Sequence, residues 1–211
     1  MKFRVPRPDE FEEIVRKFNR EWGLGECIYD ICVENLRKID LRGLTEDDVK
    51  RIVRVFLIVW GQMSRVLGRK KKKGWEKRLA NAIRSLADVL ERFRCIDLAE
   101  MTDEKFDKLI ADIKSCYSDI MGVVGPTATS KTLHIIAPRF FPMWDIKIRK
   151  LYEVSDREGG YVRFMQKLRD QWFKNNLLTE SLEKLEKELK RSKLKIIDMY
   201  NWVLAKELVD H

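Results

Sequence analysis

The stretch at residues 121–152, MGVVGPTATSKTLHIIAPRFFPMWDIKIRKLY, decides the fold, because it gathers glycine, proline and unusual polar residues between segments of helical periodicity. Gly122 and Gly125 flank two valines and are followed by Pro126. Glycine adopts backbone conformations that other residues resist, and proline suits the first turn of a helix. We therefore expect a tight turn here and a new helix over about residues 127–136.

An aromatic connector follows that helix. Pro138 cannot continue the helix, so we expect it to end first, and residues 139–144 read RFFPMW. Asp145 then stands directly before residues 146–152, which read IKIRKLY. An aspartate in that place is a favoured helix N-cap, so the sequence predicts another helix that begins after Asp145.

This order of helix, glycine turn, helix, short apolar loop, aspartate and helix resembles the core of the helix-hairpin-helix DNA glycosylase superfamily. The detailed resemblance covers residues 121–152, while the flanking segments agree only in their helical character. It implies that residues 122–128 form the hairpin that holds DNA. It also implies that Asp145 is the catalytic aspartate of a base-excising enzyme, with the two helical lobes of that family enclosing the site.

The departures from the family pattern matter as well. Two residues, in place of one, separate Gly122 from Gly125, and Pro126 and Thr127 stand where family members that cleave the DNA backbone carry a lysine. A monofunctional glycosylase is therefore favoured over a lyase. Lys131 lies one turn beyond Thr127, so its amine could still approach the site as a second catalytic group.

The resemblance also indicates residues that would hold DNA and a base. Backbone N–H groups beside a helix N-terminus bind phosphate, and aromatic faces receive a base that has left the stack. The candidate DNA contacts in and after the hairpin are Gly122, Val124, Gly125, Thr127, Ala128, Lys131, His134 and Arg149. The candidate base pocket comprises Phe140, Trp144 and Tyr152.

A second basic feature lies elsewhere in the chain. The densest run of positive charge is Arg69, Lys70, Lys71, Lys72 and Lys73, enclosed by two glycines. Adjacent cations repel one another and stay exposed, and they suit a phosphate backbone because binding releases counterions. The alternative is a solubilising surface run.

Each candidate also has an ordinary structural interpretation. Asp145 can serve purely as a helix cap, and capping is compatible with catalysis. Phe140 and Trp144 suit a hydrophobic core as well as a base pocket, and His134 suits a satisfied position between helices. Arg149 can be solvent-exposed, and Lys131 can simply complement phosphate at the surface.

The amino-acid composition bears on the class of partner and on the fold class. The chain has 211 residues, of which 36% are charged and 45% hydrophobic, with a net charge of +9. The surplus favours a polyanionic partner, with DNA first, although a thermophile-like surface explains the abundance of Lys, Arg and Glu equally well. No segment shows sustained alternation, so we expect one all-α domain over residues 1–211, with residues 177–211 forming its C-terminal helices.

Cysteine and histidine usage bears on cofactors and location. The four cysteines lack the spacing of a zinc site, so we expect no structural metal. Some members of the glycosylase superfamily hold an iron-sulfur cluster with four closely spaced cysteines near the C-terminus. No cysteine follows Cys116 here, so we expect no cluster and no other cofactor. No signal-peptide or membrane-spanning pattern is present, so we expect a soluble cytoplasmic protein with no membrane partner.

Three functions remain open on the sequence alone. The first is a monofunctional DNA glycosylase that uses Asp145. The second is a DNA-binding protein that keeps the scaffold without excising a base, and the third is a helical interaction protein. Whether Asp145 faces a pocket or only caps its helix separates the first from the second.

Overall fold

The computed structural model describes residues 3–68 and 73–207, except for the side chain of Leu24, and all regular secondary structure within them is helical. This confirms the predicted all-α class. None of the helices in those ranges is long and apolar enough to cross a membrane. The basic run from Arg69 to Lys72 lies outside the described residues.

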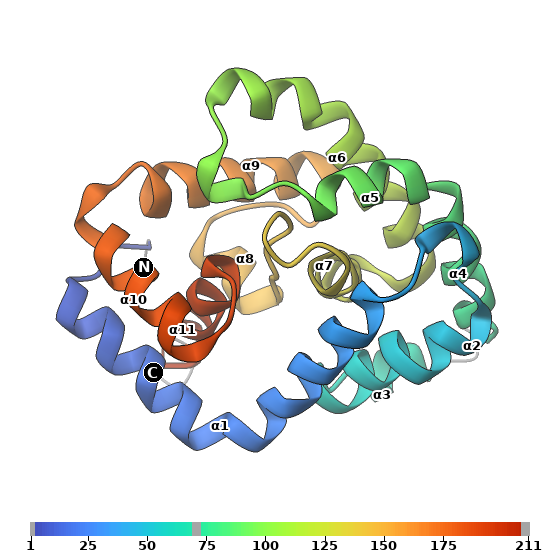
Figure 1. Cartoon of the computed structure of the whole chain (residues 1–211), viewed down its shortest axis with the longest axis horizontal. Coiled ribbons are helices and arrows are strands. Elements are labelled where there is room, and N and C mark those ends of the chain that lie inside the picture. Colours follow the sequence, from blue (N-terminus) through green and yellow to red (C-terminus); the bar gives the residue numbers. More distant parts are fainter. Residues whose placement is uncertain (1–2, 69–72, 208–211) are drawn as a thin grey trace.

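Helix α7 (Pro126–Ile136) is the centre of the fold, and the other helices surround it (Figure 1). From Ala128 to Ile136 all its residues except Lys131 are buried, including polar ones. Its bounds agree with the predicted 127–136 to within one residue. A helix that is buried on nearly every side is a core element, so side chains that project from its N-terminal end are held by packing.

Helix α1 (Pro8–Arg37) is continuous over 30 residues and bends midway along its length (Figure 1). From the sequence, Gly23 and Gly25 predict the end of this helix, because glycine commonly follows a helix C-terminus, but the helix continues through both. Each glycine in a helix interior costs only about 1 kcal/mol relative to alanine. Burial of Phe11, Phe18, Tyr29 and other apolar side chains on both sides of the glycines outweighs that cost.

The described part of the chain between residues 46 and 94 packs beside α7 through η3. Thr45 caps α2 (Glu46–Asp48) through a capping box. The same helical path continues through two π-helical segments, η2 (Val49–Val53) and η3 (Phe56–Trp60), and after a break resumes as α3 (Ser64–Leu67). Helices α4 (Trp75–Ser85) and α5 (Ala87–Arg94) follow.

The remaining helices complete the shell around α7. The long α6 (Asp103–Val124) leads directly into α7, and α8 (Ile146–Leu151) follows the aromatic connector. Next come α9 (Glu158–Leu168), α10 (Thr179–Leu189) and α11 (Lys193–Glu207). Short helical turns, η1 (Leu41–Gly43), η5 (Leu98–Glu100), η6 (Arg169–Phe173) and η7 (Asn176–Leu178), join these elements.

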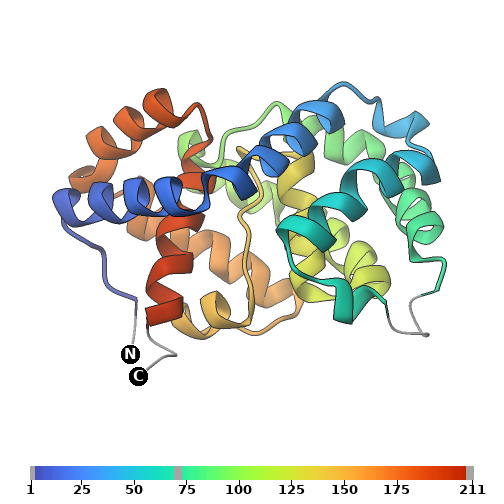
Figure 2. The same ribbon diagram turned by 90° about the horizontal axis from the view of Figure 1, so that it is seen from below.

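Helix α11 lies against both α1 and α8, so the first and last helices pack together beside α8, which Asp145 caps (Figures 1 and 2). An ion pair between Arg16 on α1 and Glu188 on α10, with N and O 2.8 Å apart, holds α10 against α1 as well. This arrangement brings residues from α1 and α11 to the N-terminal end of α7.

Candidate functional site

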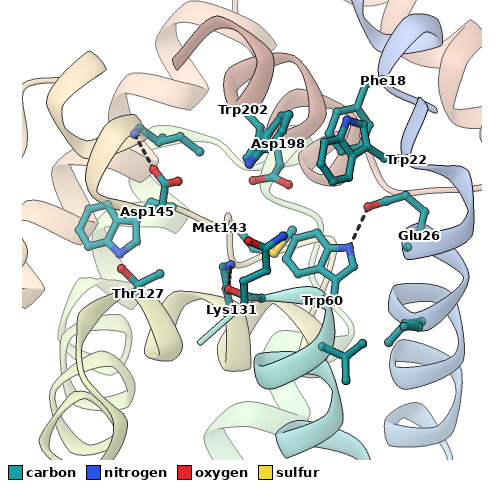
Figure 3. A pocket seen from close by; sticks show the side chains of 17 residues that line it. Phe18, Trp22, Glu26, Trp60, Thr127, Lys131, Met143, Asp145, Asp198 and Trp202 are labelled. Atoms are coloured by element: carbon teal, nitrogen blue, oxygen red, sulfur yellow. Dashed lines mark hydrogen bonds between the residues drawn. The ribbon is translucent and has the colours of Figure 1, made fainter. Parts of the chain in front are cut away.

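A cavity of about 340 Å³ lies where α1, η3, α7, α8 and α11 meet (Figure 3). Four tryptophans, one phenylalanine, one methionine, three carboxylates and one lysine contribute to its wall. The side chains labelled in Figure 3 are Phe18, Trp22, Glu26, Trp60, Thr127, Lys131, Met143, Asp145, Asp198 and Trp202. A cavity of this volume, largely apolar with a few convergent polar groups, is typical of a small-ligand site.

Asp145 faces this cavity and also caps α8. Its Oδ1 accepts the N–H of Ile148 at 2.8 Å (Figure 3). The connector before it is fixed to α7, because the buried Ser130 hydroxyl accepts the N–H of Trp144 at 3.2 Å and lies 3.1 Å from the Trp144 carbonyl oxygen. The predicted cap is confirmed, and the same residue lines the cavity.

Lys131 is the only residue between Ala128 and Ile136 that is not classed as buried, and its amine reaches the same cavity. Nζ donates to the Gly61 carbonyl oxygen at 3.3 Å and lies 4.9 Å from the centre of the Trp60 ring. Burial lowers the pKa of this amine below its usual value, and the nearby charges of Asp198 and Asp145 oppose the shift. The structure thus brings Lys131 and Asp145, both predicted catalytic candidates, to one cavity.

Two further carboxylates enter the wall from distant parts of the chain. Glu26, on α1, accepts the Trp60 indole N–H at 2.8 Å. The fully buried Lys195 lies between the two acids, with Nζ 3.1 Å from Glu26 Oε2 and 3.3 Å from Asp198 Oδ2. Burial raises the pKa of Asp198, and the opposing charges of Lys195 and Lys131 do not cancel the effect.

Sequence reasoning missed Glu26 and Asp198 as site residues. A signal was present in the last helix, where Lys195 and Asp198 interrupt the apolar face formed by Leu194, Ile196 and Ile197. Charged residues three apart on a buried helix face are rarely buried without partners. Glu26, the corresponding acid on α1, shows no comparable signal in the sequence.

The aromatic wall differs from the predicted base pocket. Trp144 lines the cavity as predicted, whereas Phe140 and Tyr152 lie in the core. Phe140 stacks on Phe93 with ring centres 4.3 Å apart, and the Tyr152 hydroxyl donates to Asn201 Oδ1 at 3.0 Å. The other aromatic faces come from residues that were not predicted, namely Phe18, Trp22, Trp60 and Trp202.

The glycine turn is shorter than expected. Gly125 alone separates α6 from α7, at a positive φ of 89°, whereas Gly122 and Val124 lie within α6. The hairpin expected over residues 122–128 is therefore a one-residue turn in this fold. Thr127 lines the cavity, and Ala128 is fully buried in the first turn of α7.

His134 is a core residue, which contradicts its predicted contact with DNA. Its side chain is fully buried, with Nδ1 2.7 Å from the Phe141 carbonyl oxygen and Nε2 2.9 Å from the Tyr29 hydroxyl. Burial lowers the pKa of His134 to about 3, so the ring is neutral. A neutral ring donates from Nδ1 to the carbonyl and accepts the tyrosine proton at Nε2, which satisfies both nitrogens.

Two other predicted basic contacts have different surroundings. Lys73 is exposed in the turn before α4. The Arg149 side chain is only 16% exposed, with its guanidinium 5.7 Å from the centre of the Trp144 ring and 3.6 Å from Asp156. Arg149 therefore supports the wall behind Asp145 and is not a free surface cation.

Comparisons with family models, with curated proteins and with solved structures found no match. Among the described residues, no group of three or more His, Cys, Asp or Glu side chains is arranged to hold a metal ion.

Proposed function

We propose that this protein binds DNA and hydrolyses the bond between a base and its deoxyribose, with Asp145 as the catalytic carboxylate. The observation that carries the proposal is that Asp145 faces an aromatic cavity of about 340 Å³, in addition to capping α8 (Figure 3). An enzyme that acts on a base must receive it in such a pocket after the base leaves the stack.

The chemistry needs one carboxylate at the reacting carbon. Breaking the bond between base and sugar generates positive charge on the sugar, and a preorganised carboxylate stabilises that charge and orients the attacking water. The N–H of Ile148 binds Asp145 Oδ1, so the orientation of the carboxylate is fixed before substrate arrives and Oδ2 remains for the sugar.

Tryptophan side chains form the part of the cavity that would hold the base. Trp22 and Trp202 meet edge to face with ring centres 5.0 Å apart, and Trp60 and Trp144 contribute to the same wall. Stacking on an aromatic side chain contributes about 1–3 kcal/mol for each base. Such a wall offsets the free energy lost when a base leaves the duplex.

Charge supports DNA as the partner. The net charge of +9 favours a polyanion. The first turn of α7 borders the cavity at Thr127, and the first N–H groups of a helix have no partner within it. A phosphate next to the flipped nucleotide would accept a hydrogen bond from the Thr127 N–H.

Water, and not Lys131, is the proposed nucleophile. The Lys131 amine is held by the Gly61 carbonyl oxygen and the Trp60 face, and it would have to leave both to reach a sugar. Its lowered pKa nevertheless makes it the amine in this cavity that would form a covalent adduct if one forms. Borohydride treatment distinguishes the two reactions.

The test is incubation with labelled duplexes that each contain one uracil, hypoxanthine, oxidised guanine, alkylated base or mismatch, followed by separate treatments with hot alkali and borohydride. We expect cleavage that depends on alkali and no trapped adduct. Asp145→Asn should keep duplex affinity, because asparagine also caps helices, and should lose excision. Asp40→Asn is the matched control, since Asp40 caps η1 on the surface away from the cavity.

Unchanged excision by Asp145→Asn would reject Asp145 as the catalyst. Binding of every duplex without cleavage would show a non-catalytic DNA-binding protein, and a trapped adduct that Lys131→Gln abolishes would show a lyase.

A further inference from the structure

Asp198 is a second carboxylate in the cavity, and the proposed role of Asp145 leaves it without a function. It projects from α11 and points into the cavity, with Asp145 on one side and Lys131 below (Figure 3). Only 8% of Asp198 is exposed, and its α11 backbone packs against α8, whose first turn Asp145 caps. The two acids therefore line one cavity from different elements.

Glu26 and Asp198, the two acids beside Lys195, differ in how many further partners compensate their charge. The ammonium of Lys195 is shared between Glu26 and Asp198, at 3.1 and 3.3 Å. Glu26 has additional partners, because it accepts from Trp60 and lies 3.4 Å from the guanidinium of Arg191. Asp198 has fewer compensating contacts than Glu26, so its carboxyl group is placed to take up a proton and pass it on.

The electrostatic environment agrees with this assignment. Burial is the largest influence on Asp198 and raises its pKa, Glu26 adds to the effect, and Lys195 and Lys131 oppose it. Two carboxylates in one site with different environments are a recurring arrangement for acid and base roles in glycoside cleavage.

We infer that Asp198 is the general acid of this site and that the substrates are purine nucleotides, whose base leaves as a neutral molecule after it receives the Asp198 proton. The inference rests on the proposed function. The bond between C1′ and N9 breaks and its electron pair passes into the purine ring, which takes the proton from Asp198 at a ring nitrogen. Water adds to C1′ and gives its proton to Asp145, and solvent then returns both carboxyl groups to their starting states.

The choice of purine follows from the leaving group. A purine such as adenine or hypoxanthine is a poor leaving anion, so proton donation accelerates its departure, typically about 10²–10⁴-fold for general acid catalysis. Uracil leaves as a stabilised anion and gains little from an acid. A 7-methylguanine base already carries the positive charge that protonation would supply, so its departure does not need the acid.

The test compares three single-base duplexes, containing hypoxanthine, 7-methylguanine or uracil, under single-turnover conditions over about pH 5–9. For wild type we expect hypoxanthine excision to fall as pH rises through the pKa of Asp198, because the acid must be protonated. Asp198→Asn should slow hypoxanthine excision about 100-fold or more and remove that dependence, while 7-methylguanine excision changes little. Asp198→Glu should restore part of the rate.

The 7-methylguanine duplex also serves as the folding control, because a misfolded Asp198→Asn variant would lose excision of both bases. Asp170→Asn is the matched surface control, since Asp170 is exposed and lies 2.8 Å from the exposed Lys174. The inference is overturned if Asp198→Asn excises hypoxanthine at the wild-type rate and with the wild-type pH profile, if it loses both bases equally while keeping its fold, or if wild type removes uracil and no purine. Loss of activity in Asp145→Asn together with full activity in Asp198→Asn would reject this inference and leave the proposed function standing.

Discussion

Replacing Lys195 with methionine tests the charge arrangement behind the cavity. Lys195 is fully buried and lies 3.1 Å from Glu26 and 3.3 Å from Asp198. Methionine keeps most of the side-chain volume and removes the positive charge. Arg191 and the Trp60 indole N–H still contact Glu26, so the loss falls mainly on Asp198.

The expected loss of stability is large. Removing one partner of a buried ion pair costs about 3–5 kcal/mol, because the other charge is left without compensation. For a chain of this size each kcal/mol lowers Tm by about 2–4 °C, so we expect Tm to fall by roughly 6–20 °C. A cation at an exposed site that lies over an aromatic ring contributes only about 0.5–1 kcal/mol. Lys206→Met is therefore the control, since Lys206 lies on the same helix over Trp202.

The loss should depend on pH. The pKa of Asp198 is already raised in the folded protein, and without Lys195 it rises further above the unfolded value. The folded state then binds more protons than the unfolded state, so stability increases as pH falls through the folded pKa. Lowering the pH towards the unfolded pKa of aspartate should recover part of the loss, and adding Asp198→Asn to Lys195→Met should recover it at neutral pH.

The assay is urea unfolding of wild type, Lys195→Met, Lys206→Met and the Lys195→Met/Asp198→Asn double variant at several pH values. A Lys195→Met loss of under about 1 kcal/mol, the size of an exposed ion pair, would refute the reasoning. A loss that stays constant with pH would refute the assignment of the uncompensated charge to Asp198.

Three further variants test individual contacts by the same unfolding assay. Tyr29→Phe leaves Nε2 of the neutral, buried His134 without its donor, so we expect a loss of about 1–3 kcal/mol; no loss would show that another group supplies the proton. Gly125→Ala meets no atom within 4 Å of the added Cβ but keeps a φ of 89°, so backbone strain alone should cost about 1–3 kcal/mol, and a neutral result would mean that the turn relaxes. Asp145→Ala removes the bond to the N–H of Ile148 and should lose about 1 kcal/mol, whereas Asp145→Asn should lose less; equal stability of the two would contradict the cap.

The sequence was informative where the interactions are local. Pro126 and Pro138 bracket α7, and Asp145 stands directly before the helix it caps, so neighbouring residues determine these features. Local signals also misled. Gly23 and Gly25 lie inside α1, because tertiary burial on both sides of them outweighs their low helix propensity.

The site itself could be predicted only in part. Lys131 and Asp145 were found because they share the segment that carries the resemblance, and they do line one cavity. Glu26 and Asp198 were missed because their meeting depends on how α1 packs against α11, which no local pattern records. His134 has the alternative role, a satisfied position between helices, and its partner Tyr29 comes from a helix more than 100 residues away, so no local pattern could choose between the two roles.

The packing of α1 against α11 also determines the order in which the cavity can form during synthesis. Glu26 leaves the ribosome long before Lys195 and Trp202, and at about 5–20 residues per second the interval is roughly 10–35 s. Throughout that time α1 has no C-terminal helix to cover its apolar face. The aromatic wall closes only after α11 has emerged, so until then this face of α1 stays open to chaperones and proteases.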